Sequence, residues 1–437
     1  MSVYYPHTSE DEAEMLARIG AAGVDELYSD VPQSLRAGEL NLPSGMSESE
    51  AEEKLEALAS KNRRYSSVMR GAGAYRHYIP KIVDEVASKS SFLTAYTPYQ
   101  AEMSQGVLQS IFEYQTYIAR LTGMEAANAS MYSGATAAAE AVMQCVKSGK
   151  TVAVSRDIRP DTKRVLETYL ENRDIKIKYW DTEIGTSAAE SLKSVFDADV
   201  AAVYVEQPAY SGEVVDLKAV AEFVHSAGAK LIAGGNPLAY ALIPSPGDCG
   251  ADVAVGDAQP FGQPLSFGGA YLGYYAVPKK DVRKMPGRIV GQTTDRKGNI
   301  AYVLTLQPRE QHIKRERALS NICSNQALCA LRAAAYLAAM GGSGLYKVAL
   351  NSYQNAHFAA KEFEKAGLKI KNGEFFNEFV TISDGKSEKI EAALKAEGIL
   401  SGLKLSADEM LWCFTELNGR ADIGRAALII KEIGGAK

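Results

Sequence analysis

A regular alternation of apolar strand-like runs and amphipathic helical stretches over residues 150–257 constrains the fold more than any other feature of the chain. The strand-like runs are KTVAVS (150–155), IKIKYW (175–180), VAAVYVEQP (200–208), KLIAGG (230–235) and DVAVGD (252–257). Helical stretches such as 161–174 and 216–228 separate most of them. Strands that alternate with helices of this length form βαβ units, so the pattern predicts a mostly parallel sheet that is covered on both faces.

The 437 residues are too many for one small core and suit a large α/β domain plus a smaller one. A polar segment (279–316) and an Ala-rich helix (325–340) follow the alternating region, and three glycines at 341, 342 and 344 are expected to break the helix. We therefore predict an N-terminal helical and extended segment (1–90), a large domain (91–310), connecting helices (311–344) and a small C-terminal α/β domain (345–437).

Composition excludes several classes of function. The chain has 48 basic and 53 acidic residues, a net charge of −5, which does not indicate a nucleic-acid-binding protein. The longest apolar tract (327–340) is interrupted by Arg332 and is too short to cross a bilayer. The acidic start lacks the features of a signal peptide, and five scattered cysteines fit reduced thiols. We expect a cytoplasmic protein with neither a membrane nor a nucleic acid as partner.

Three polar or Gly-rich stretches lie where strands end or helices begin. They are YSGATAAAEA (132–141), LIAGGNPLA (231–239) and VAVGDAQPFGQPLSFGGAYLG (253–273). The free N–H groups at the start of the helix in the first stretch would suit a phosphate. A plain N-cap by Ser133 or Thr136 explains the same residues. Taken together, the three stretches repeat the order found in fold-type I enzymes that use pyridoxal phosphate (PLP).

PLP chemistry makes three demands on a protein: a lysine that forms a Schiff base, a carboxylate that keeps the pyridine nitrogen protonated, and a flat group that stacks on the ring. The turn after the strand at 252–257 contains Ala258, Gln259 and Pro260, and no lysine. Because a glutamine amide has no nucleophilic amine, Gln259 cannot form the covalent link. The sequence therefore predicts a PLP-type scaffold without the reactive group.

Four long motifs resemble the glycine cleavage system P-protein. They are GAGAYRHYIP (71–80), YTPYQAEMSQG (96–106), TGMEAANASMYSGATAAAEA (122–141) and REQHIKRERALSNICSNQALCALRA (309–333). More narrowly, the chain resembles the first, or α, subunit of the two-chain type of this family. The resemblance implies a fold-type I PLP-dependent transferase-like large domain. It also implies a glycine decarboxylase that releases CO2 and passes an aminomethyl group to the lipoyl arm of H-protein.

In that family the second, or β, subunit carries the chemistry, and its motifs can be placed on this chain residue by residue. The ring-stacking His falls on Thr136, the pyridine-pairing Asp on Ala233 and the Schiff-base Lys on Gln259. The resemblance therefore implies no catalytic residue and no cofactor in this chain's own pocket. It implies PLP in a partner β subunit, within an α2β2 heterotetramer that acts on glycine and on lipoylated H-protein.

The resemblance also implies that this chain lends residues to its partner's site and that its first 90 residues lie at the subunit interface. Tyr96, Tyr99, Glu102 and Gln105 are the candidates for contact with the partner's cofactor or with the substrate; packing at the interface explains them equally well. Arg76 and His77 are candidates for binding an anion or lining the channel for the lipoyl arm, with an ordinary ion pair as the alternative. The basic run 309–317 is a candidate docking site for H-protein.

Two other hypotheses stay open at this point. The chain could be a stand-alone PLP enzyme that uses a displaced lysine, for which Lys230, Lys279 and Lys280 are nearest in sequence to the predicted site. It could also be a non-catalytic structural homodimer of the same fold.

Overall fold

The computed structural model describes residues 6–38, 41–93, 98–182, 187–307, 311–318, 320, 322 and 325–435. The chain divides into two units, Met1–Arg64 and Tyr65–Lys437. The smaller unit contains helices α1 (Ser9–Ile19) and α2 (Glu48–Ala59), and each begins with a capping box. No described residue of this unit is buried. The finer boundaries that we place at 90, 310 and 344 stay predictions.

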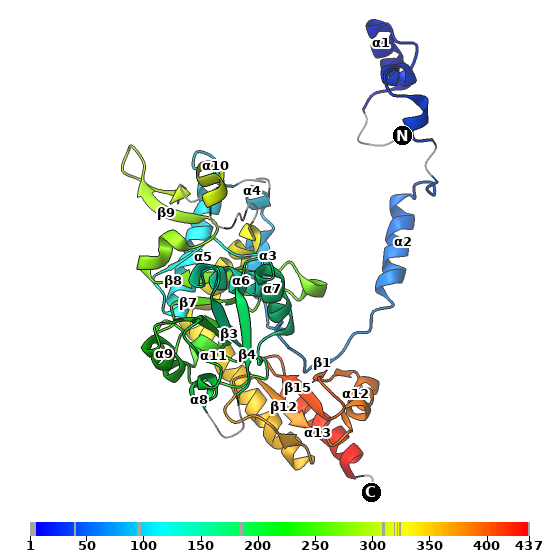
Figure 1. The fold of residues 1–437 in the computed structure, drawn as a ribbon. Helices are drawn as coiled ribbons and strands as arrows, with labels where there is room; N and C mark the ends of the chain where they lie inside the picture. The colour runs from blue at the N-terminus through cyan, green and yellow to red at the C-terminus, as the bar shows by residue number, and fades with distance from the viewer. Residues whose placement is uncertain are drawn as a thin grey trace. The chain divides into compact units, whose positions relative to one another are not determined.

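The larger unit is built on a seven-stranded sheet with the order β2-β8-β7-β6-β5-β3-β4 (Figure 1). The strands are β2 (Ala126–Ala127), β3 (Thr151–Ser155), β4 (Lys176–Trp180), β5 (Val200–Glu206), β6 (Lys230–Gly234), β7 (Val253–Asp257) and β8 (Gly273–Val277). Neighbouring strands from β4 to β7 pair in parallel, and β8 is antiparallel to β7 and β2. The predicted mostly parallel sheet is confirmed.

Alternate residues of these strands point to opposite faces of the sheet, and each face has its own apolar layer. Val152 and Val154 pack with helices α6 (Gly134–Cys145) and α7 (Pro160–Leu170) on one face. Ala153 belongs to the layer on the other face. That layer contains residues of helices α5 (Gln105–Thr122), α8 (Ala188–Lys193), α9 (Leu217–Ser226) and α11 (Ala327–Lys365). Both faces are therefore covered, as expected for βαβ units.

Helix α11 is bent at Gly341, whose φ of 59° is not helical, so the predicted break lies inside one long helix. This helix is long and apolar enough to meet a compositional test for a membrane span, a test that core helices of globular proteins also meet. Its residues Ala330, Ala333 and Tyr336 are fully buried in the larger unit.

The C-terminal part is an antiparallel sheet with the order β11-β12-β15-β14. Its strands are β11 (Lys369–Ile370), β12 (Glu378–Ile382), β14 (Leu403–Lys404) and β15 (Glu409–Cys413), and α12 (Ser387–Ala396) and α13 (Arg420–Gly435) complete it. Phe363 of α11, Ile390 of α12 and Ile423 of α13 share one apolar cluster with Trp412 of β15. This arrangement matches the predicted small α/β module.

Residues 65–80, which we call the crossing segment, run from the C-terminal part to the large sheet. Strand β1 (Ser67–Val68) pairs in parallel with β13 (Ile399–Leu400). The N–H of Cys413 donates to Met69 O, and farther along the N–H of Tyr75 donates to Gln259 Oε1. Helix α3 (Lys81–Ala87) follows. The crossing segment thus connects the two sheets close to the predicted site.

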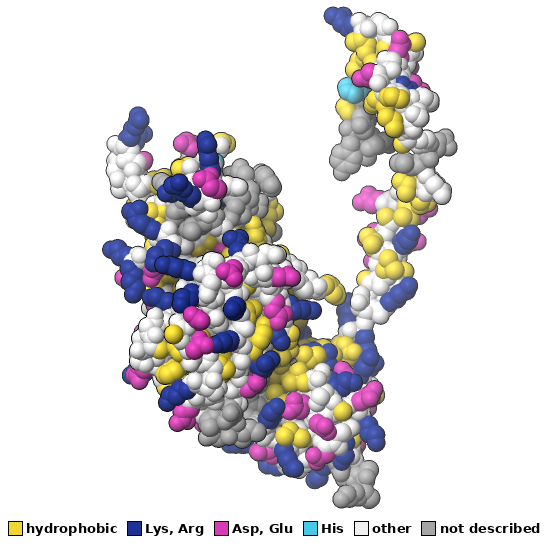
Figure 2. Space-filling model, in the orientation of Figure 1, with side chains coloured by type: hydrophobic (Ala, Val, Ile, Leu, Met, Phe, Trp, Pro, Cys, Tyr) yellow, Lys and Arg dark blue, Asp and Glu magenta, His cyan; other side chains and the backbone are white. Residues whose placement is uncertain are grey.

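The polar segment at 279–316 contains a hairpin that the sequence analysis did not predict. Strands β9 (Ile289–Thr294) and β10 (Ile300–Thr305) pair antiparallel, and Figure 2 shows Lys and Arg side chains at the hairpin tip. Asp295 holds the turn, because its Oδ1 accepts hydrogen bonds from the N–H groups of Lys297 and Asn299, at 2.8 Å each. The segment is therefore an ordered projection from the larger unit.

Candidate functional site

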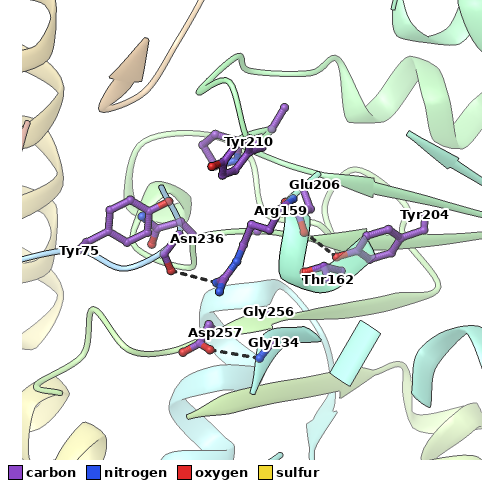
Figure 3. A pocket seen from close by; sticks show the side chains of 14 residues that line it. Tyr75, Gly134, Arg159, Thr162, Tyr204, Glu206, Tyr210, Asn236, Gly256 and Asp257 are labelled. Atoms are coloured by element: carbon purple, nitrogen blue, oxygen red, sulfur yellow. Dashed lines mark hydrogen bonds between the residues drawn. The ribbon is translucent and has the colours of Figure 1, made fainter. Parts of the chain in front are cut away.

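A small cavity lies at the carboxyl ends of β5, β6 and β7, where ligands bind in sheets of this kind (Figure 3). We call it the central cavity. Its volume is about 30 Å³. Small-molecule pockets usually measure roughly 300–1,000 Å³, so the central cavity is small by comparison. Its lining includes Tyr75, Gly134, Arg159, Glu206, Asn236 and Asp257.

The side chain of Arg159 extends into the central cavity (Figure 3). Its Nη1 donates to Gly73 O at 2.9 Å, and its Nε and Nη2 donate to the two carboxylate oxygens of Asp161 at 3.0 and 2.6 Å. Burial alone would lower the pKa of Arg159, but the charges of Asp257 and Asp161 raise it. The cavity therefore contains a permanent, internally paired cation.

Asp257, the last residue of β7, binds the start of helix α6. Its carboxylate accepts hydrogen bonds from the N–H groups of Gly134 at 3.2 Å and Gln259 at 3.0 Å. Burial raises the pKa of Asp257, while Arg159 and these N–H groups oppose that rise. An internal carboxylate thus sits at the helix start, where the sequence analysis considered a phosphate.

Thr136, the predicted position of the ring-stacking His, belongs to the capping box of the same helix. Ser133 Oγ accepts from the N–H of Thr136 at 3.3 Å, and Thr136 Oγ1 accepts from the N–H of Ser133 at 3.1 Å. The plain N-cap, which the sequence analysis left open as an alternative to a phosphate site, therefore describes this helix start.

Gln259, the predicted position of the Schiff-base Lys, is buried, and both its amide oxygen and its amide nitrogen form hydrogen bonds. Its Oε1 accepts from the N–H of Tyr75 at 2.8 Å. Its Nε2 donates to Tyr75 O and to Gln263 O, both at 2.9 Å. The amide therefore acts as a clamp on the crossing segment, a role that needs an acceptor as well as a donor.

Ala233, the predicted position of the pyridine-pairing Asp, is fully buried in the apolar layer of the sheet. Among the described residues that line the central cavity there is no lysine. Lys230 is paired with Asp252, its Nζ 2.5 Å from Oδ1, and Lys279 and Lys280 are exposed. None of the three lysines considered for a displaced Schiff base lines the central cavity.

Two buried glutamates flank the central cavity, and each accepts a hydrogen bond from a tyrosine hydroxyl. Glu206 accepts from Tyr204 Oη and from the N–H of Arg159, both at 3.0 Å. Glu378 accepts from Tyr75 Oη at 2.7 Å and from the N–H of Ala72 at 2.6 Å. Burial raises the pKa of each carboxyl to about 7. These groups are therefore half protonated near neutral pH.

These residues do not fit PLP. The cavity is small, Asp257 binds the helix start, the guanidinium of Arg159 lines the cavity, and Gln259 stands at the predicted lysine position. A phosphate placed here would meet the Asp257 carboxylate, and a pyridine ring would find an alanine in place of its charge partner. We therefore derive no chemical step through a cofactor held by this chain's own residues.

Of the residues predicted to be lent to a partner, Tyr96 lies outside the described residues. The ring of Tyr99 lies 4.2 Å from the Arg288 guanidinium, and its Oη donates to Asn325 Oδ1 at 3.1 Å. Glu102 is exposed.

Gln105 forms hydrogen bonds with other residues of this chain. Its Nε2 donates to Tyr302 O at 2.9 Å and its Oε1 accepts from the N–H of Tyr302 at 2.8 Å. Gln105 thus attaches the β9–β10 hairpin to α5, which is a structural role.

Arg76 and His77 are adjacent in sequence but differ in surroundings. His77 is buried, with its Nδ1 2.7 Å from Glu416 Oε2, which is the ordinary ion pair that the sequence analysis left open. Burial would raise the pKa of Glu416, but the His77 hydrogen bond and charge lower it. Arg76 is exposed.

Of the basic run 309–317, the described residues 311–317 form α10 (Gln311–Lys314) and a following turn.

The sequence analysis missed Arg159, Glu206 and Glu378. Glu206 ends β5, and Arg159 begins α7 just after β3. Because ligand sites in parallel sheets form at the carboxyl ends of strands, polar residues at those ends were a usable signal. Glu378 lies on the C-terminal sheet, and no local pattern connects it with Tyr75.

Solved structures with low sequence identity share the fold. An aspartate aminotransferase from Thermus thermophilus superimposes with a TM-score of 0.59 at 14% identity, covering 84% of this chain and 99% of that chain. A C-DES mutant with glycine covalently linked to its PLP cofactor gives a TM-score of 0.62 at 12% identity, covering 86% and 98%. These are PLP-dependent fold-type I enzymes, and the predicted fold class is confirmed.

Closer relatives cover the whole chain. Probable glycine dehydrogenase (decarboxylating) subunit 1 from Geobacillus thermodenitrificans is 45% identical, covering 99% of this chain and 98% of that protein. The protein of the same name from Desulfitobacterium hafniense is 43% identical, covering 98% and 99%. A crystal structure of glycine decarboxylase (P-protein) of the glycine cleavage system, in inhibitor-bound form, gives a TM-score of 0.91 at 39% identity, covering 99% of this chain and 100% of that chain.

The family model of the glycine cleavage system P-protein matches residues 2–429. With this match and relatives above 40% identity over nearly its full length, the chain belongs to the glycine cleavage system P-protein family.

Proposed function

We propose that this chain is the non-PLP-binding first subunit of a cytoplasmic glycine dehydrogenase (decarboxylating) and works together with a PLP-bearing second subunit. Relatives that share its full length are named subunit 1 of that enzyme, which implies a second subunit. When bound there, PLP draws electrons away from the α-carbon of glycine so that CO2 can leave. The aminomethyl group then passes to the lipoyl arm of H-protein, within an α2β2 assembly.

The proposal rests mainly on the hydrogen bonds of the Gln259 side chain. All the hydrogen-bonding groups of its amide are used on Tyr75 and Gln263, and the adjacent central cavity contains Arg159. A site of this kind can neither link PLP covalently nor admit it. The decarboxylation therefore requires a second chain.

This chain's contribution would be to complete the partner's site with side chains from the loop at 96–105. Of its four candidates, Gln105 and the Tyr99 hydroxyl already form hydrogen bonds within the chain, so Tyr96 and Glu102 remain for contact with the partner's substrate or cofactor. A tyrosine hydroxyl such as that of Tyr96 can donate a hydrogen bond to an anionic group of the substrate.

Reconstitution tests the proposal. The isolated chain, the isolated second subunit and their mixture are assayed with H-protein for exchange of labelled bicarbonate into glycine. Activity is expected in the mixture alone, and the purified chain should show no absorbance from bound PLP. Exchange by the isolated chain would overturn the proposal.

The stand-alone enzyme is the second candidate, and borohydride reduction followed by peptide mapping distinguishes it. A pyridoxyl-lysine in this chain would establish it. The absence of lysine among the described residues that line the central cavity argues against it. A structural homodimer would be indicated if no second subunit co-purified or restored activity.

A further inference from the structure

The segment 279–300 concentrates positive charge in a chain that is acidic overall. It has seven basic and two acidic residues, a net charge of +5, whereas the whole chain carries −5. It comprises the short helix η5 (Lys279–Lys284), strand β9 and the tip of the β9–β10 hairpin, and the structure describes all of its residues. A local excess of one sign attracts partners of the opposite sign, so the segment favours an acidic partner.

Five basic side chains of this segment face solvent without an acidic partner. None of them forms an ion pair with a described residue. Figure 2 shows Lys and Arg side chains along the edge of the larger unit where Figure 1 places β8 and β9. We call the five exposed side chains the basic edge; they are those of Lys279, Lys280, Arg283, Arg296 and Lys297.

The two acidic residues of the segment have partners of their own. Asp281 is 9% exposed, and its Oδ1 lies 2.9 Å from Lys284 Nζ. Asp295 Oδ2 accepts from Asn299 Nδ2 at 3.0 Å, in addition to the backbone N–H groups that its Oδ1 binds in the hairpin turn. The Asn299 side chain and these N–H groups lower the pKa of Asp295. The basic edge therefore keeps a net positive charge.

Helix α5 holds the hairpin at both of its strands. Gln105 binds both backbone groups of Tyr302 in β10, as described above. Gln115 does the same for Val290 in β9: its Nε2 donates to Val290 O and its Oε1 accepts from the N–H of Val290, both at 2.9 Å. The charges at the hairpin tip are thus presented from an anchored projection and not from a free loop.

The basic edge has little apolar surface around it. Ile300 is 64% exposed, and no other large apolar side chain of the segment 279–300 is exposed. Permanent interfaces have apolar cores, whereas charge complementarity mainly speeds association and selects the partner. The segment also contains no Phe, Trp or Tyr on which the bases of a single-stranded nucleic acid could stack. The basic edge therefore fits an acidic protein that binds and leaves.

We propose that the basic edge is a docking surface for an acidic face of the lipoylated H-protein. This inference rests on the proposed function, in which two proteins work with this chain. The second subunit stays bound, whereas H-protein arrives and leaves in every turnover to carry the aminomethyl group away. A charged surface that is poor in apolar groups suits the second kind of partner. The basic edge is separate in sequence from the run 309–317 that the sequence analysis considered for H-protein.

Exchange of labelled bicarbonate into glycine by the mixture of both subunits, measured against the concentration of H-protein, tests this surface. Two double variants reverse its charge, Lys279→Glu with Lys280→Glu and Arg296→Glu with Lys297→Glu. Each should raise the KM for H-protein by at least about fivefold, with a smaller effect on kcat, because the lost attraction slows encounter and weakens docking. Lys389→Glu with Lys404→Glu reverses as many charges at exposed positions of the C-terminal part and should leave this KM unchanged.

Ionic strength provides the second readout. Between about 0.05 M and about 0.3 M salt, screening should raise the wild-type KM for H-protein steeply and that of the two double variants less steeply. A merely structural defect would lower kcat or the melting temperature and leave the salt dependence as in wild type.

The outcomes separate this inference from the proposed function. An inactive mixture of wild-type subunits would contradict the proposed function itself. An active mixture in which both double variants keep the wild-type KM and salt dependence would overturn the docking surface alone. Random-sequence duplex DNA that bound this chain and competed with H-protein would also overturn it, because the surface would then be a general site for polyanions.

Discussion

At the scale of single residues, the amide of Gln259 exchanges hydrogen bonds with both backbone groups of Tyr75, 184 positions away in sequence. A lysine has three donors and no acceptor, so it would leave the N–H of Tyr75 unpaired. The residue that replaces the reactive lysine has thus acquired a structural task. A lysine at position 259 would break the hydrogen bond that the N–H of Tyr75 donates and so destabilise the crossing segment.

Gln259→Lys is therefore expected to lower the free energy of unfolding by roughly 2–4 kcal/mol, because it buries an ammonium group and leaves one N–H unpaired. Urea unfolding measures this loss. After incubation with PLP and borohydride, no pyridoxyl-lysine should appear at position 259. Gln109→Lys, at an exposed position of α5, should be near neutral. Covalent PLP at residue 259 would show that a cofactor pocket persists.

Glu378 gives the chain a stability that depends on pH. Burial raises its pKa from 4.5 to about 7, so the folded chain holds a proton that the unfolded chain releases between these values. Stability should therefore fall as pH rises from about 5 to about 7, by up to about 3 kcal/mol for this group. Glu206 adds to the same slope because its pKa is raised in the same way.

Glu378→Gln should flatten this slope by about half, since the amide can accept from the N–H of Ala72 and donate to the Tyr75 oxygen without titrating. Urea midpoints measured from pH 5 to pH 8 provide the comparison. Glu388→Gln, at an exposed position of α12, is the matched control and should keep the wild-type slope. An unchanged slope in Glu378→Gln would mean that this carboxyl is ionised throughout.

At the scale of elements, helix α11 contains two adjacent glycines, Gly341 and Gly342, that differ in backbone conformation but have equally open surroundings. A Cβ added at Gly341 or at Gly342 would meet nothing within 4 Å. Gly341 has a φ of +59°, and the backbone of Gly342 is helical. Substituting alanine at each of the two positions therefore tests the effect of backbone strain without a change in side-chain packing.

Gly342→Ala should raise the free energy of unfolding by about 0.5–1 kcal/mol, because alanine loses less entropy in a helix. Gly341→Ala should lower it by about 1–2 kcal/mol, because an L-residue is strained at that φ. Thermal or urea unfolding of the two variants gives the comparison directly. Similar effects of the two substitutions would mean that α11 is straight in solution.

Some of these helices and strands could be predicted from the sequence, and others could not. Strands β3, β5, β6 and β7 were predictable as apolar runs and β4 (KIKYW) as an alternating run, and helices separate most of them. The β9–β10 hairpin was missed because its middle (292–299) is polar, although β10 is the mostly apolar run IAYVLT and Asp295 and Gly298 are turn residues. The contacts of His77 with Glu416 and of Tyr75 with Glu378 join positions more than 300 residues apart, and only tertiary folding brings them together.

Within the candidate site, the sequence alone predicts that the lysine, the carboxylate and the stacking group of a PLP site are missing. It does not predict which side chains occupy the site instead. Arg159 follows no motif, and its place in the central cavity depends on how α7 packs beside β5 and on Gly73 of the crossing segment. Sequence reasoning therefore predicted a site without its reactive group, while the structure shows a site filled by its own side chains.

At the scale of the whole molecule, the described residues of the N-terminal unit form no buried core. No described residue of Met1–Arg64 is buried, and Ile19, Leu35, Leu42 and Leu55 are each more than 60% exposed. Apolar side chains on short helices need a surface to pack against. We expect the second subunit to supply that surface, in keeping with the predicted interface role of the first 90 residues.

Hydrogen–deuterium exchange tests this expectation. In the isolated chain, amides of α1 and α2 should exchange at least tenfold faster than those of β5, whose residues are largely buried. Adding the second subunit should slow exchange in α1 and α2 and leave β5 unchanged. Protection of α1 and α2 in the isolated chain would show that this unit already has a packing partner.

The pairing of Arg159 with Asp161, and of Asp257 with the start of α6, has a consequence for the cell. Enzymes that hold PLP are stabilised by it through mass action, so their folded fraction depends on cofactor supply. This chain supplies the cation, the carboxylate and the bonds to the α6 start from its own sequence. We therefore expect its abundance to be insensitive to vitamin B6 starvation, whereas the proposed PLP-bearing second subunit should respond to it.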